Sequence, residues 1–157
     1  MKKYLLPLLL VSTPAFADTP REAFEGLHSC LTREASSCSN YFTSGSQELY
    51  GKVVTYDLGR CVPQEVSYVS ETGVGSSRMV RAKIVDGEST HMARFNFTQE
   101  NGQWKLNLPE TLKRGLGEKW QSYVMATEQA YVFLQAQLKV KPGCEMVSAL
   151  AKQPKEN

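Results

Sequence analysis

The fold is decided by residues 78–108, which read RMVRAKIVDGESTHMARFNFTQENGQWKLNL. Apolar and polar side chains alternate along this stretch, and the pairs Asp86-Gly87 and Asn101-Gly102 interrupt the alternation. Strict alternation is typical of strands with one buried face, and such pairs tolerate the positive φ angles of tight hairpin turns. The stretch therefore predicts three antiparallel strands joined by two hairpins, and we expect a fourth strand just before them.

The alternation also assigns the two faces of the predicted sheet. The apolar face must be covered, because each Å² left in water forfeits about 25 cal/mol. Helical periodicity flanks the strands in residues 20–36, 46–58 and 120–138. The prediction is an α+β domain, in which N-terminal helices and a long C-terminal helix pack on one face of an antiparallel meander of about four strands. The residues of the apolar face are Val80, Ala82, Ile84, Ala93, Phe95, Phe97, Trp104 and Leu106.

The first seventeen residues have the pattern of a secretory signal peptide. Lys2 and Lys3 precede a short apolar run, and residues 15–17 (AFA) supply a small-x-small cleavage site. The run is too short to cross about 30 Å of hydrocarbon, and no later run is long enough. We expect cleavage after Ala17, a periplasmic or secreted protein, and no membrane span. The expected divisions are a signal peptide at 1–17, one domain at 18–151 and a disordered tail at 152–157.

Cys30, Cys38, Cys61 and Cys144 all follow the expected cleavage site. An even number of cysteines in an oxidising compartment predicts two structural disulfides. The chain contains no Cys-x-x-Cys pair, which argues against a redox motif or a zinc site. Four cysteines allow three pairings. We prefer Cys38 with Cys61 and Cys30 with Cys144, because the second bridge would tie the C-terminal segment to the N-terminal half.

Charge argues against nucleic acid as a partner. Removal of Lys2 and Lys3 leaves sixteen basic and sixteen acidic residues, so the mature chain has no net charge. Local patches remain, because four cations share the polar face of the predicted sheet. They could receive an anionic ligand or an acidic partner, or they could form an ordinary solvated outer face, which is the rule for half-buried sheets. These cations are Arg81, Lys83, Arg94 and Lys105.

The alternation along the strand places His91 on the same face as Phe95 and Phe97. A histidine there could act as a general base, because its ordinary pKa is close to working pH. The alternative is a histidine at a strand end that satisfies a local hydrogen bond. No Gly-x-Ser-x-Gly, His-Glu-x-x-His or Gly-Lys-Ser/Thr motif accompanies it. We therefore predict no metal and no cofactor, and His91 is the one candidate catalytic residue.

Residues 92–97 (MARFNF) and 100–106 (ENGQWKL) resemble the last hairpin of the nuclear-transport-factor-like superfamily, the cone-shaped α+β fold shared with SnoaL-like proteins. In that superfamily a long strand ends in a polar turn, and the next strand begins Gly-x-Trp-Lys-aliphatic. The helix start PREAF at 20–24 is similar too. The chain departs from the family by about fifty further residues after the last strand. The resemblance implies a conical pocket between a curved sheet and its helices, but it implies no particular reaction.

Three functional hypotheses follow. The first is a non-catalytic exported protein that binds a protein partner in the envelope or a small apolar or anionic ligand, as an envelope inhibitor, a toxin-immunity protein or a secretion accessory factor would. The second is a small cofactor-free SnoaL-like hydrolase or isomerase with His91 as base. The third is an obligate homodimer formed through the long C-terminal helix. The lack of a catalytic cluster favours the first. Tyrosines that could supply contacts are Tyr50, Tyr56, Tyr68, Tyr123 and Tyr131.

Overall fold

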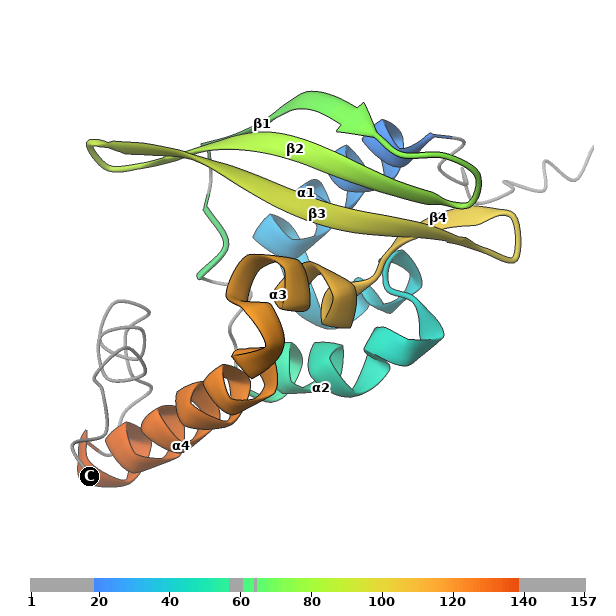
Figure 1. Cartoon of the computed structure of the whole chain (residues 1–157). Coiled ribbons are helices and arrows are strands. Elements are labelled where there is room, and N and C mark those ends of the chain that lie inside the picture. The colour runs from blue at the N-terminus through green and yellow to red at the C-terminus, as the bar shows by residue number, and fades with distance from the viewer. Residues whose placement is uncertain (1–18, 57–60, 64, 139–157) are drawn as a thin grey trace, which may run out of the picture.

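The computed structural model describes residues 19–56, 61–63 and 65–138. The expected signal peptide, the expected tail and Cys144 lie outside these residues. The described chain is α+β, as predicted, with a four-stranded sheet and helices below it (Figure 1). The elements are α1 (Pro20–Glu34), η1 (Ala35–Ser37), η2 (Ser39–Tyr41), η3 (Ser44–Ser46), α2 (Gln47–Thr55), β1 (Glu65–Thr72), β2 (Ser77–Asp86), β3 (Ser89–Glu100), β4 (Gln103–Leu106), α3 (Leu108–Leu116), η5 (Gly117–Lys119) and α4 (Trp120–Leu138).

The sheet is an antiparallel meander with strand order β1-β2-β3-β4, which confirms the predicted topology. Gly87 lies in the turn between β2 and β3 with φ 58°. Asn101 and Gly102 form the turn between β3 and β4 with φ 54° and 76°. These left-handed angles are favourable for Gly and tolerable for Asn, so the two pairs fix where the strands reverse.

The apolar face of the sheet packs against α1. In the β2–β3 register Val80 lies opposite Phe95, so both point to this face. The Phe24 ring of α1 lies 5.4 Å from the Phe95 ring and 6.5 Å from the Phe97 ring, the second contact being edge-on. Phe97 and Val80 are completely buried. This aromatic packing fills the space between the sheet and α1.

The start of α1 is fixed by a capping box, as its sequence predicts. The Glu22 N–H donates to Thr19 Oγ1 at 3.2 Å, and the Thr19 N–H donates to the Glu22 carboxylate at 3.1 Å. Pro20 occupies the first turn, where its missing N–H costs nothing. The cap sets the point from which Phe24 and Leu27 project into the core.

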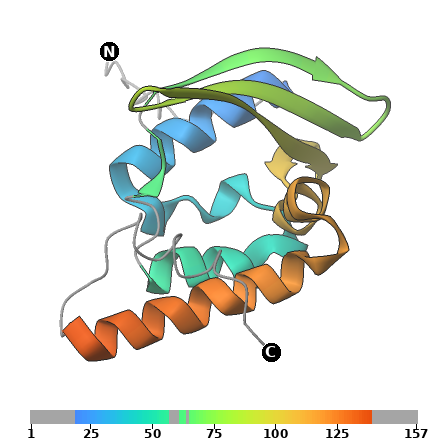
Figure 2. The ribbon, with the colours of Figure 1, turned by 60° about the vertical axis from the view of Figure 1, so that its left-hand side comes forward.

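A second helical layer lies beyond α1, as Figure 2 shows. There α4 runs along α2, on the side of α2 that faces away from the sheet. Tyr131 and Leu134 of α4 form a small core of their own with Tyr56, whose ring lies 4.8 Å from that of Tyr131. Thus α1 covers the sheet, α3 contacts β3, and the long C-terminal helix covers α2. No described helix combines the length and the apolarity that a bilayer span requires.

The preferred cysteine pairing is wrong, because the structure joins Cys30 to Cys38. The turn η1 follows α1 directly and brings Cys38 back beside the last turns of that helix, with a Cα–Cα distance of 5.8 Å. The Cys38 N–H donates to the Tyr50 hydroxyl at 2.9 Å, and that hydroxyl donates to the Ala35 carbonyl at 2.6 Å. Cys61 is also disulfide-bonded.

Candidate functional site

Ser46 joins the sheet to the helical layer. Its buried hydroxyl accepts a hydrogen bond from the Leu108 N–H at 2.9 Å and donates to the Leu106 carbonyl at 3.2 Å. One side chain at the start of α2 therefore holds the end of β4 and the start of α3. The Asn107 side chain caps α3 by accepting from the Glu110 N–H at 3.1 Å. These bonds set the spacing between α2 and α3.

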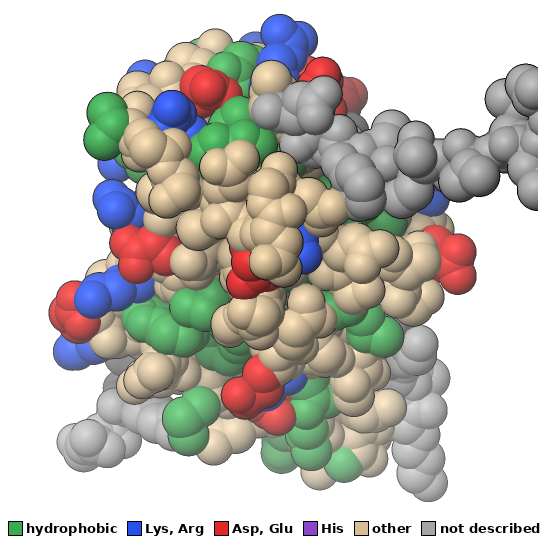
Figure 3. Space-filling view, turned by 90° about the vertical axis from the view of Figure 1, so that its right-hand side faces the viewer, with side chains coloured by type: hydrophobic (Ala, Val, Ile, Leu, Met, Phe, Trp, Pro, Cys, Tyr) green, Lys and Arg blue, Asp and Glu red, His purple; other side chains and the backbone are tan. Residues whose placement is uncertain are grey.

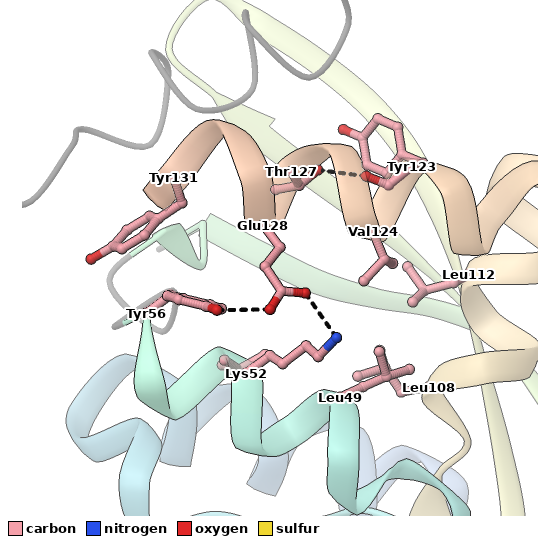
Figure 4. A pocket seen from close by; sticks show the side chains of 11 residues that line it. Leu49, Lys52, Tyr56, Leu108, Leu112, Tyr123, Val124, Thr127, Glu128 and Tyr131 are labelled. Carbon is pink, nitrogen blue, oxygen red and sulfur yellow. Dashed lines mark hydrogen bonds and ion pairs between the residues drawn. The ribbon is translucent and has the colours of Figure 1, made fainter. Parts of the chain in front are cut away.

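A pocket of about 190 Å³ opens between α2, α3 and α4 (Figure 4). Apolar side chains from all three helices make up most of its wall. A lysine, a glutamate and a tyrosine form one polar end. The lining residues are Leu49, Lys52, Val53, Tyr56, Leu108, Leu112, Tyr123, Val124, Thr127, Glu128 and Tyr131. The pocket is thus apolar apart from this one polar end, which we call the polar corner.

Glu128 is the centre of that polar corner. Its carboxylate points from α4 toward α2, between Lys52 and Tyr56 (Figure 4). Lys52 Nζ donates to Glu128 Oε2 at 2.9 Å, and the Tyr56 hydroxyl donates to Glu128 Oε1 at 2.8 Å. Each carboxylate oxygen has one partner and keeps acceptor capacity for a second. The network also ties α4 to α2.

The network shifts the pKa values of its three members. Hydrogen bonds from Lys52 and then Tyr56 hold the pKa of Glu128 below its ordinary value. The hydrogen bond to Glu128 raises the pKa of Lys52, and the same acceptor raises the pKa of Tyr56. At neutral pH the corner therefore contains a carboxylate, an ammonium and a protonated phenol. The two charges cancel, so the pocket presents no net charge to a ligand.

This corner is suited to binding and poorly suited to proton transfer. A general base works best with a pKa near the operating pH, whereas Glu128 is shifted further below it. Both of its oxygens already accept a hydrogen bond. A bound group can use the remaining acceptor capacity without displacing either partner. The volume suits one ring or a short branched chain, since an apolar cavity of about 150 Å³ binds benzene.

This pocket lies among the helices, whereas His91 lies on the sheet. It is opposite Ile84, near the β2–β3 turn, and it shares the parity of the apolar face as expected. Its side chain is exposed, and it does not line the pocket. The aromatic core of Phe24, Phe95 and Phe97 occupies that face further along the strands. A role for His91 as a base stays a prediction without a described partner group.

The predicted basic residues are brought together only in part. Arg81 lies directly opposite Arg94, and Lys83 follows Arg81 on the same face of β2. All three are exposed. Lys105 lies further along the same face, opposite Thr98 on β3, and is partly buried. Binding of an anionic ligand at this face stays a prediction.

Lys105 is engaged by Glu100. Its Nζ lies 3.7 Å from Glu100 Oε2. Glu100 in turn accepts hydrogen bonds from the Ser44 hydroxyl at 2.7 Å and from the Ser44 N–H at 3.1 Å. The bond from the Ser44 hydroxyl is the main reason that the pKa of Glu100 is lowered. Lys105 therefore belongs to a link between η3 and the β3–β4 hairpin.

Sequence reasoning missed the polar corner. It identified Tyr56, Tyr123 and Tyr131 as contact candidates, and all three line the pocket. It did not identify Lys52 or Glu128. A signal for Glu128 exists, because it is the only charged residue between Lys119 and Lys139. An isolated charge in a long, otherwise uncharged helix indicates a candidate polar site, because a charged side chain leaves the solvent mostly when it is paired.

Comparison with known proteins identifies no relative. No family model matches the chain, and neither a curated protein nor a solved structure has significant similarity to it. The function must therefore be argued from the site itself.

Proposed function

We propose that this protein is a non-catalytic exported binding protein, and that the pocket between α2, α3 and α4 is its ligand site. The proposal rests on one observation, an apolar pocket of about 190 Å³ whose polar corner holds two charges that neutralise each other. Such pockets bind compact apolar groups, and a few polar atoms orient them. The signal-like N-terminus and the cysteine pattern support export.

The ligand class that fits is an uncharged apolar group of about one ring. An anion would be repelled by the Glu128 carboxylate, and a cation would be repelled by the Lys52 ammonium. Either would also lose its hydration on entering the apolar walls, without gaining a free counter-charge. A neutral group has no such cost, and a single hydroxyl on it could donate to Glu128.

Calorimetry with toluene, benzoate and benzylammonium tests this proposal. The oxidised protein should bind toluene with a Kd of about 1 mM, given the free energy that seven heavy atoms can supply. Both charged analogues should bind at least about tenfold more weakly, because each meets a like charge or loses hydration. Equal affinity for all three probes, or no binding of toluene, would contradict the proposal.

A pocket-filling variant localises the binding. Val124→Phe places a ring in the pocket and should abolish toluene binding. Leu49→Phe fills the pocket from α2 and guards against a folding defect in the first variant. The matched control is Val69→Phe on β1, where the valine is 49% exposed. Circular dichroism checks that each variant is folded. Unchanged binding in folded Val124→Phe and Leu49→Phe would place the ligand elsewhere.

A side chain of a protein partner presents the same chemistry as a free small molecule. Photocrosslinking from position 49 in intact cells distinguishes the two sources. A protein partner gives an adduct of higher mass on a gel, whereas a free ligand does not. Position 69 serves as the control, since it lies on the sheet. An adduct from position 69 alone would contradict a partner at the pocket.

A further inference from the structure

The outer face of α4 is unusual for a surface helix. Nine residues of α4 are exposed among those whose side chains the structure describes, and none of the nine is charged. The single charge of the helix, Glu128, points inward to Lys52. Three of the exposed residues are large and apolar: Met125 at 58%, Val132 at 51% and Phe133 at 58%. Hydrophobic side chains reach the surface in the lower half of Figure 3, where the helices lie.

Five of the exposed residues form one ridge, which we call the α4 ridge. They are spaced by four, so they follow one inclined row along the helix. All five are exposed. The ridge spans about 24 Å at 1.5 Å per residue. Its members are Gln121, Met125, Gln129, Phe133 and Gln137.

The α4 ridge is symmetric in its chemistry about Gln129. Four residues to either side stand the apolar Met125 and Phe133, and four further out stand two glutamines. An isologous dimer needs this property, because residue i of one copy meets residue j of the other, and j meets i. With two antiparallel helices crossing at Gln129, Met125 of each copy meets Phe133 of the other.

From this symmetry we propose that α4 is a self-association surface, and that a second copy of the chain binds antiparallel across Gln129. The thioether of Met125 then contacts the aromatic ring of the second copy's Phe133, which is a favourable pairing. The two Gln129 amides can donate to and accept from each other. Rows spaced by four interdigitate at a crossing angle of about −50°, so the outer glutamines lie at the rim.

Charge selects a second copy over a charged partner. One carboxylate, that of Glu128, borders this face, but it is paired with Lys52. The face therefore offers no free charge to an acidic or basic surface, and it meets its own copy without net repulsion. The other outward faces of the molecule differ, since α1 and β2 expose Arg21, Glu25, Arg81 and Lys83. A single helix crossing buries less than the roughly 800 Å² per partner of a standard interface. The expected Kd is therefore weak, about 10–100 µM.

Sedimentation of the oxidised full chain from about 1 µM to about 1 mM tests the proposal. The wild type should change from monomer to dimer across this range. Met125→Glu and Phe133→Lys should each weaken association at least tenfold, because each places a charge against an apolar side chain of the second copy. Val69→Glu, at a valine on β1 that is 49% exposed, should leave the Kd within twofold. A wild-type monomer at all concentrations would overturn the proposal.

The antiparallel register is tested by combining the charges. In the double variant Met125→Glu/Phe133→Lys each glutamate meets a lysine of the second copy, so the Kd should return to within threefold of wild type. A mixture of the two single variants should form heterodimers more readily than either forms homodimers. A double variant as weak as the singles would overturn the antiparallel crossing at Gln129. Toluene calorimetry on the same variants keeps this result separate from the ligand site.

Discussion

The two long helices α1 and α4 differ in where their charged side chains point. In α1 they face solvent, whereas in α4 the one charged side chain faces the neighbouring helix α2. Five of the six exposed residues of α1 are charged, and its apolar side chains enter the core below the sheet. In α4 the only charged residue, Glu128, points inward to Lys52 and Tyr56, and the outer face carries Met125 and Phe133. The difference separates two tasks. The layer of α1 and the sheet supplies stability, whereas the layer of α2 and α4 supplies a pocket and an uncharged surface.

The largest expected change in stability comes from truncating a core residue in each layer and comparing the two losses. Phe97→Ala should lower the free energy of unfolding by about 3–5 kcal/mol, because a completely buried ring leaves a cavity. Leu134→Ala in α4 should cost less, about 2 kcal/mol, since a small cluster can collapse around the vacancy. Urea titration followed by far-UV circular dichroism measures both. A larger loss for Leu134→Ala would reverse the assignment of stability to the sheet layer.

The disulfide between α1 and η1 gives the next effect. Replacing Cys30 and Cys38 together by serine should cost about 2.5 kcal/mol, the loop-closure entropy of a nine-residue loop. Urea unfolding of the double variant gives this value, and peptide mapping of the wild type verifies the bridge. Recovery of Cys30 linked to Cys61 or Cys144 would contradict the structure.

Ser46 tests the connection between the layers. Ser46→Ala leaves the Leu108 N–H and the Leu106 carbonyl without the buried hydroxyl, which should cost about 1–3 kcal/mol. Ser29→Ala on α1 is the matched control. The Ser29 side chain is exposed, so its loss should cost no more than about 0.5 kcal/mol. Equal losses for the two variants would show that Ser46 does not hold the layers together.

The smallest effect is the acid dependence of the α2–α4 contact. The pKa of Glu128 is lowered from the ordinary 4.5, so its stabilisation is complete above that value and is lost as pH falls through the lowered pKa. Glu128→Gln should therefore be less stable than wild type at about pH 7, and the difference should shrink toward about pH 3. Hydrogen exchange of α4 amides measures it.

The control for the acid dependence is Glu48→Gln. The Glu48 carboxylate is 87% exposed and lies 3.9 Å from Lys52, so this change should alter α4 protection little at any pH. If Glu128→Gln and wild type differ equally at both pH values, the carboxylate does not act through its charge.

Much of the fold could be predicted from sequence, because it rests on local rules. Asp86-Gly87 and Asn101-Gly102 reverse the chain where expected, and the parity that they set places Val80 and Phe97 inside. The cysteine pairing could not be predicted, since it depends on the turn η1 that returns Cys38 to α1. No local rule of sequence favours that short loop over the other pairings.

The site was only half predictable for a related reason. A stripe of apolar residues identifies α4 and places Tyr131 and Leu134 inside. The stripe does not show that Glu128 also points inward, because a glutamate on a helix is usually solvated. Its partner Lys52 comes from α2, more than seventy residues earlier, and only the packing of the two helices brings them together.

The most direct test of the account is a titration of isotope-labelled protein with toluene, followed by two-dimensional NMR. The predicted result is that the amides of Lys52, Leu112 and Val124 and their neighbours in α2, α3 and α4 shift with one common Kd, while those of β1 and β2 do not move. Shifts centred instead on the sheet, around His91 or around Arg81 and Arg94, would contradict the assignment of ligand binding to the helical layer.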